Sequence, residues 1–223
     1  MNTDKTSATY PYERVINTVW MKHLDAIPKM LIDYIMDMPL PGYTPPDDNT
    51  YPRCRLMKYL YYDGPRPLDN PLPSPADKIK LFYNSDSPDV APTEKGYRLY
   101  PVSYVPQAQT RGQTILKCFV GNVKPLNQNI VQIGIVFDIL SNMQMDTNTK
   151  TLAQSRCVAI EQCLWECLSG VNIDGVGTLY IDRQQLSETG SGNIMDSAQN
   201  IGRRVIFGMT YGDSATPPHT ASI

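Results

Sequence analysis

The clearest alternation of apolar and other positions lies in "NIVQIGIVFDIL", residues 129–140. Every odd position from Val131 to Ile139 is apolar, whereas the even positions mix apolar, small and polar residues. A period of two is typical of a β-strand with one buried face. The preceding run "QTILKCFVGNV", residues 113–123, alternates in the same way, and the loop "KPLNQN" joins the two. We therefore predict two adjacent antiparallel strands.

Two segments show the period of an amphipathic helix instead. Apolar residues recur at steps of three and four between Ile16 and Met38, which predicts a helix over residues 13–38 that kinks or breaks at Pro28. Residues 147–169 predict a second helix, with Gly170 at its C-terminal cap. One stripe of this helix should cover the two strands: Leu152, Arg156, Ile160, Cys163, Leu164, Cys167 and Leu168.

A proline-rich excursion, residues 39–106, separates the first helix from the strands. We expect ordered, extended loops packed over a core, because Leu, Tyr and Phe remain frequent there. "RCRLMKYLYY" fits a short helix or a strand, while "KIKLFYN" and "YRLYPVSYV" are predicted to be short extended pieces. Any strand here should lie at a sheet edge, because proline gives no hydrogen-bond donor to the ladder.

Two further runs, "GVGTLYIDR" and "GRRVIFGMTYG", complete the predicted strand set, and in the second Val205, Phe207, Met209 and Tyr211 face one way. The order of elements predicts an α+β fold, with a mostly antiparallel sheet packed by an N-terminal and a central helix. The predicted single domain spans residues 13–212. A flexible arm (1–12), a long polar insert (184–201) and a flexible tail (213–223) are expected around it.

Composition narrows the class of protein. The 223 residues include 41% apolar and 19% charged residues and carry a formal charge of -2, so no basic excess indicates a nucleic-acid-binding surface. Five cysteines are an odd number, which disfavours a complete disulfide framework and favours synthesis in a reducing cytoplasm. The polar first residues and the lack of an apolar run of about 20 residues predict neither secretion nor a membrane span.

Candidate catalytic and metal-binding chemistry is sparse. The two histidines, His23 and His219, fall in the first helix and the tail, where no triad can be proposed. Cys163 and Cys167 are four residues apart on one helix face, which suits either a soft metal site or a packed core stripe. The motif "TGSG" lacks the lysine of a phosphate loop, and the pair Asp47/Asp48 lies among turn-forming residues. We therefore expect no enzyme and no cofactor or metal.

The chain resembles the tail terminator and neck proteins of tailed bacteriophages over residues 13–212. The resemblance rests on the N-terminal helix and "RCRLMKYLYYDGPRPLDNPLPSPADKI", then on "TILKCFVGNV" with "IVQIGIVFDIL". It continues through the helix "LAQSRCVAIEQCLWECLSG" and the last strand "RRVIFGMTYGD", which follows a long insertion. The excursion at 39–106 is longer than a minimal member of that family needs.

The resemblance implies a homohexameric ring in the virion. Such a ring caps the tail tube, joins it to the head connector and lets DNA pass through its lumen. A head-completion adaptor, a baseplate or tail component, a monomeric glycan- or peptide-binding module and an unrecognised enzyme remain alternatives. The 14 tyrosines fit the binding module, because tyrosine is frequent on interaction surfaces.

A ring also suggests which residues meet other subunits or the lumen. Some lie on the even face of the 129–140 strand, the two arginines begin the last strand, and the apolar residues of the insert would be docking points. The candidates are Gln132, Gly134, Asp138, Arg203, Arg204, Leu186, Ile194 and Met195. We expect the insert to be mobile in the free protomer and ordered by contacts with other chains, because its composition cannot bury much apolar surface.

Overall fold

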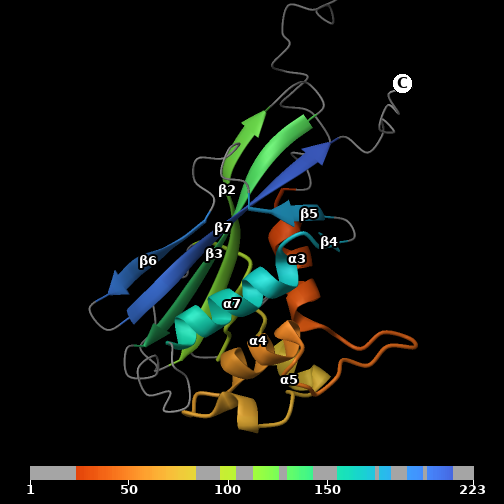
Figure 1. Cartoon of the computed structure of the whole chain (residues 1–223), viewed down its shortest axis with the longest axis vertical. Helices are drawn as coiled ribbons and strands as arrows, with labels where there is room; N and C mark the ends of the chain where they lie inside the picture. The colour runs from red at the N-terminus through yellow and green to blue at the C-terminus, as the bar shows by residue number, and fades with distance from the viewer. Residues whose placement is uncertain are drawn as a thin grey trace, which may run out of the picture.

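The computed structural model describes residues 24–83, 96–103, 113–125, 130–142, 155–173, 176–181, 190–197 and 200–212. Within these residues the chain forms an α+β fold, as the element order predicted. Figure 1 shows the helices gathered against one side of a long, curled sheet. The predicted arm at 1–12 and the tail at 213–223 lie outside the described residues.

The sheet consists of seven described strands in the order β1-β2-β3-β7-β5-β4, with β6 also paired to β7. The strands are β1 (Leu99–Tyr100), β2 (Thr114–Pro125), β3 (Ile130–Asn142), β4 (Asn172–Ile173), β5 (Gly177–Tyr180), β6 (Gly190–Ser197) and β7 (Asn200–Gly212). All pairings are antiparallel except that of β1 with β2. The short β1 lies at one edge and is followed by Pro101, so the prediction of edge strands in the excursion is confirmed.

The predicted central hairpin is also confirmed. β2 and β3 pair from Thr114 opposite Ser141 to Pro125 opposite Val131. β3 then pairs with β7 along its whole length, from Ile130 opposite Gly212 to Asn142 opposite Asn200. β2, β3 and β7 extend to the end of the sheet that lies farthest from α4 and α5 (Figure 1).

The described helices are α3 (Ala26–Met36), α4 (Pro52–Tyr61), η1 (Pro67–Asp69, a 3-10 turn), α5 (Pro75–Leu81) and α7 (Arg156–Leu168). Proline begins α4 and α5, where its missing N–H would have no partner inside the helix. Ser155 caps α7 by accepting a hydrogen bond from the Val158 N–H, and Gly170 follows with φ +74°, as predicted for a C-terminal cap.

Pro28 falls in the first turn of α3, so the described helix begins beside it and is not interrupted by it. Residues 13–23, the first part of the predicted helix, lie outside the described residues. The same holds for residues 147–154 of the second predicted helix.

The prediction that "KIKLFYN" is extended is wrong. Residues up to Leu81 belong to α5, because Ser74 accepts a hydrogen bond from the Asp77 N–H and Pro75 starts the helix. "RCRLMKYLYY" is helical as α4. The excursion is therefore a small helical layer with proline-rich connections, not only a set of extended loops.

The hydrophobic core lies between this helical layer and one face of the sheet. The odd positions of β3 from Val131 to Ile139 are fully buried there. α7 covers β3 and β7, while α3 and α4 lie against β2. Phe137, Phe207 and Trp165 meet at the centre, with ring centroids 5.6–5.8 Å apart.

The polar insert is partly a strand. Residues 190–197 form β6, which pairs with β7 from Gly190 opposite Ile206 to Ser197 opposite Asn200. This differs from the expectation that the whole insert is ordered only by other chains. Composition could not reveal it, because backbone pairing with β7 needs no apolar side chains. Residues 182–189 lie outside the described residues.

No helix in the described part of the chain is both long enough and apolar enough to cross a membrane.

Candidate functional site

The side of the sheet opposite the helical layer, here called the outer face, carries the even positions of β3. No described helix packs on it. Its side chains form successive cross-strand rows, each contributed by β2, β3 and β7. The candidate residues Gln132, Gly134 and Asp138 all lie on this face, in different rows.

The row nearest the end of β3 is covered by aromatic residues of the excursion. Ile115 and Leu140 are opposite each other and buried, and they pack with Tyr100. Tyr83 and Tyr97 cover this group, with ring centroids 5.4–5.6 Å between neighbouring tyrosines. Burial raises the pKa of Tyr100 well above its ordinary value of 10. Ile194 of β6, predicted to be a docking point for other chains, packs against this cluster in its own protomer.

The next row is ionic. Arg204 of β7 donates two hydrogen bonds of 2.7 Å to the carboxylate of Asp138, which is 5% exposed. The hydrogen bonds from Arg204 to Asp138 raise the pKa of that arginine above its ordinary value. Lys117 of β2 is opposite Asp138. The Arg204 side chain keeps 45% of its surface exposed, and its guanidinium lies 6.0 Å from the ring centre of Phe119.

Beyond the ionic row lies a depression of about 170 Å³, here called the glycine hollow. Its lining is Phe119, Gly121, Asn122, Gly134, Val136, Arg204 and Ile206. The register of β2 shifts between Val120 and Val123, so Gly121 and Asn122 together are opposite Gly134. The two glycines form the floor, and the apolar side chains form most of the wall.

Close packing explains the glycine at position 121, whereas a Cβ at position 134 would make only ordinary van der Waals contacts. A Cβ on Gly121 would lie 2.7 Å from Cγ2 of Val136, and a Cβ on Gly134 would lie 3.6 Å from the backbone of Asn122. The bulged strand therefore approaches β3 closely at this point. Further along, Gln132 donates a hydrogen bond of 3.4 Å to the Tyr180 hydroxyl, which lies 3.0 Å from the Thr210 hydroxyl. Lys124, opposite Gln132, is exposed.

Arg203 is on the other face from Arg204, because neighbouring residues of a strand point to opposite sides. Its guanidinium hydrogen bonds to Glu161 of α7, to Asn193 at 2.8 Å and to Ser191 at 3.0 Å. Through these contacts Arg203 connects β7 both to α7 and to β6. The arginines that the sequence grouped as one basic feature serve two separate ion pairs in the structure.

We expect the ion pair between Glu161 and Arg203 to make the free energy of unfolding depend on pH. Burial would raise the pKa of Glu161, but hydrogen bonds from Arg203, Ser191 and Trp165 outweigh burial and hold that pKa below its ordinary 4.5. The native state then binds fewer protons than the unfolded state, so this stabilisation is present above pH 4.5 and is lost as pH falls through the folded pKa.

Thermal unfolding of the wild type and of Glu161→Gln at about pH 6 and about pH 3.5 checks this. The wild type should unfold at the higher temperature at pH 6, and the difference should narrow at pH 3.5. An equal difference in unfolding temperature between the two proteins at both pH values would show that ionisation of Glu161 does not stabilise the fold.

A second exposed feature is the turn between α3 and α4, here called the Leu40 turn (residues 39–43). Leu40 and Tyr43 exchange backbone hydrogen bonds of 3.1 and 2.9 Å, and Gly42 has φ +78° after Pro41. This is the conformation of a type II turn, which needs glycine at that position. Leu40, the first residue of this turn, is 65% exposed, and the connection projects from the helical layer (Figure 1).

Charged residues at the base hold the Leu40 turn in place. The Tyr43 hydroxyl donates to both carboxylate oxygens of Asp37 at 3.1 Å, and Arg53 pairs with that carboxylate at 2.9 Å. Arg53 also lies 4.6 Å from the ring centre of Tyr34. The buried Lys78 donates to the Asp37 carbonyl at 3.0 Å, and burial lowers the pKa of this lysine. The turn is therefore pre-organised by partly buried ion pairs.

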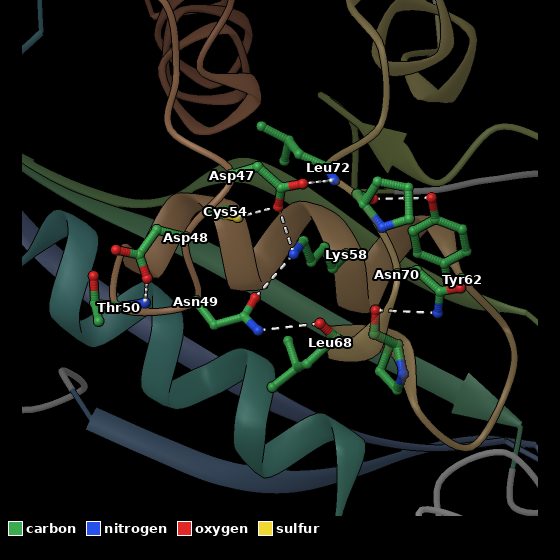
Figure 2. Close-up of polar contacts among 12 residues, drawn as sticks. Asp47, Asp48, Asn49, Thr50, Cys54, Lys58, Tyr62, Leu68, Asn70 and Leu72 are labelled. Carbon is green, nitrogen blue, oxygen red and sulfur yellow. Dashed lines mark hydrogen bonds and ion pairs between the residues drawn. The ribbon is translucent and has the colours of Figure 1, made fainter.

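Figure 2 shows how the connection after the turn is fixed to α4. Asp47 accepts hydrogen bonds from Lys58 at 2.6 Å and from the Leu72 N–H at 3.0 Å. These two contacts hold the pKa of Asp47 below its usual range. Asn49 accepts from Lys58 and donates to the Leu68 carbonyl, each at 3.0 Å. Asp47 thus anchors two proline-rich segments to one helix.

The remaining candidate residues are placed as follows. Met195 is 76% exposed on β6, and Leu186 lies outside the described residues. Cys163 and Cys167 are buried in the core, which confirms that these thiols fill a packed helix stripe. Burial raises the pKa of Cys163 to about 12. Among the described residues, no three His, Cys, Asp or Glu side chains gather as they would around a metal ion.

Sequence reasoning missed the Leu40 turn and the glycine hollow. A signal for the turn was present in "LPGY", where proline followed by glycine favours a type II turn. No comparable signal exists for the hollow, because the bulge that forms it depends on the register between β2 and β3.

Comparison with known proteins gives one match. No curated protein sequence and no solved structure matches the chain. The profile of the YomW family matches residues 54–207, which extend from α4 into β7 and include the central hairpin, α7 and most of the outer face. The chain therefore belongs to the YomW family, a protein family derived from Bacillus phages.

Proposed function

We propose that this protein is a structural component of a phage virion that forms a ring in the neck. The ring would cap the tail tube, join it to the head connector and let DNA pass through its lumen. Membership of a phage-derived family supports a role in a phage, and the resemblance to tail terminator and neck proteins suggests the position.

The observation that carries the proposal is the outer face itself. An antiparallel sheet packs one face on its own core and can leave the other for water or for a partner. Around the glycine hollow this face carries partly exposed Phe119 and Ile206 beside the exposed Arg204. Apolar surface next to an accessible arginine is typical of protein interfaces.

The strand edges support self-assembly as well. β1 pairs with β2 only at Leu116 and Lys117, so it leaves the rest of that edge without a described neighbour. β6 similarly has β7 on one side and no described strand on the other. Uncovered strand edges offer backbone groups to other chains, and proteins that must stay monomeric usually protect them.

Burial of two tyrosines reduces the aromatic surface that a monomeric glycan-binding module would use. Tyr59 and Tyr100 are buried and offer no surface to a glycan, whereas Tyr83, which packs on Tyr100, also lines a depression of about 510 Å³ beside α3. A head-completion adaptor or a baseplate component would use the same surfaces in another place of the virion, so these remain the second choice.

Native mass spectrometry and electron microscopy of the purified protein test the proposal. We expect particles with a mass that is a whole-number multiple of 25.0 kDa, with six copies as the expected count, and a central opening in the images. A protein that stays at 25.0 kDa over the whole accessible concentration range and binds glycan or peptide alone would refute a ring.

A further inference from the structure

The Leu40 turn has the properties of an element that inserts into another molecule. The apolar side chain of Leu40 is exposed, and contacts of Asp37 with Arg53 and Tyr43 hold the turn that carries it in one conformation. A loop that is already rigid in its bound conformation loses little entropy when it binds. The network therefore presents Leu40 at a fixed position on the surface, where it is available to a partner.

The backbone of the turn also lowers the desolvation free energy of burying it in a partner. Pro39 and Pro41 have no N–H group, and the N–H and C=O of Leu40 are bonded to Tyr43. No N–H group of residues 39–41 is therefore left to lose a hydrogen bond to water when the turn enters an apolar site, which lowers the desolvation cost. The matching site must be a small depression with apolar walls.

The glycine hollow fits this requirement. Its volume of about 170 Å³ accommodates a leucine side chain, and Phe119, Val136 and Ile206 give it apolar walls. It lies on the outer face, whereas the Leu40 turn projects from the helical layer (Figure 1). The two surfaces are therefore different parts of one protomer, and each can meet the other only on a second copy.

Charge favours the same pairing. The described side chains of the outer face include three cations, Lys117, Lys124 and Arg204, and one acid, Asp138, which gives a net +2. The connection that carries the turn, residues 38–52, contains Asp47 and Asp48 and no lysine or arginine. Asp47 pairs with Lys58, whereas Asp48 accepts a hydrogen bond of 2.8 Å from the Thr50 N–H and pairs with no cation among the described residues, so Asp48 is the acid for an incoming cation. Two outer faces would repel each other, whereas an outer face and this connection attract.

We propose that Leu40 of one copy inserts into the glycine hollow of the next copy, with Asp48 near Lys124 of that neighbour. The contact joins two different surfaces, so it propagates head to tail and closes into a ring when the rotation between copies allows. This inference rests on the proposed function, because it names the surfaces through which the protomers of the ring meet.

Cysteine cross-linking between two variants tests the contact. All five native cysteines are buried, so a cysteine placed at the exposed Leu40 offers a selectively reactive thiol. Purified Leu40→Cys and Ile206→Cys are mixed and oxidised under mild conditions. We expect a disulfide-linked dimer in a yield about tenfold above that of a control pair, Ile79→Cys with Ile206→Cys, because contact raises the effective concentration of the thiols. Ile79 is 59% exposed on α5, outside the turn.

A charge exchange provides a second measurement that needs no cysteine. Asp48→Lys and Lys124→Glu should each weaken self-association about threefold to tenfold, and the double variant should recover most of the loss. Recovery is expected only if the two positions meet between copies. If both single variants assemble like the wild type, these two positions do not meet.

The outcomes separate this contact from the proposed function. A ring of normal mass without the Leu40–Ile206 cross-link refutes the contact and leaves the ring intact. A chain that is monomeric at every concentration refutes both. A ring that forms normally without Leu40, while Leu40 is needed to bind a different virion protein, also refutes the contact between copies.

Discussion

Replacing Arg156 with alanine should lower the free energy of unfolding by about 3 to 5 kcal/mol, because it removes one side of a buried charge-assisted network. The Arg156 side chain is fully buried at the start of α7. Its guanidinium donates to the carbonyls of Tyr59 at 3.0 Å and of Tyr62 and Gly64 at 2.6 Å, just where α4 ends. The carbonyls at a helix C-terminus have no partners inside the helix and favour a cation.

Chemical denaturation of Arg156→Ala and of a matched control, Arg55→Ala, measures this effect. Arg55 also joins α4 to α7, through Glu166, but the two side chains keep 22% and 36% of their surface exposed. Its loss should cost no more than about 1 kcal/mol, because exposed ion pairs contribute little. Equal losses for the two variants would mean that burial of Arg156 and its three carbonyl contacts do not stabilise the junction.

Gly202→Ala should be the second most damaging change, with an expected loss of about 2 to 4 kcal/mol from overpacking. Gly202 of β7 is opposite Leu140 of β3. A Cβ there would lie 2.3 Å from the backbone oxygen of Ile139 and 2.7 Å from a methyl group of Leu140. A backbone oxygen within a ladder cannot move aside alone, so β3 and β7 would have to separate locally.

Gly192→Ala is the control for this change. Gly192 is opposite Arg204, on the neighbouring strand β6, and a Cβ there would meet nothing within 4 Å. Its replacement should alter stability by less than about 0.5 kcal/mol. If Gly202→Ala unfolds at the same denaturant concentration as the wild type, the close approach of β3 and β7 at this position is absent in solution.

Much of the framework could be predicted from the sequence, because local periodicity reports which side of an element is buried. The alternation at 129–140 and at 113–123 predicted β3, β2 and their pairing, and the stripe from Arg156 to Leu168 predicted α7 over them. Gly170 predicted the end of that helix, because a left-handed φ favours glycine. The prolines predicted that a strand of the excursion lies at an edge.

The local signals that were misread concern short segments. In "SPADKIKLFYN" the run "KIKLFYN" was predicted to be extended, but the Ser74 cap and Pro75 start a helix. Seven residues contain too few positions to separate a period of two from one of 3.6, so capping residues decide such cases.

The sequence by itself determined β2, β3, β7 and α7 and the buried face of each long strand, because these follow from residues within a few positions of one another. Only the tertiary structure decided what lies on the outer face. There Tyr83 and Tyr97 cover one end, Asp138 finds Arg204, and a bulge in β2 opens the glycine hollow. It also separated Arg203 from Arg204 and gave β6 its place beside β7. These features depend on register and on contacts between residues tens of positions apart, which a period along the chain does not encode.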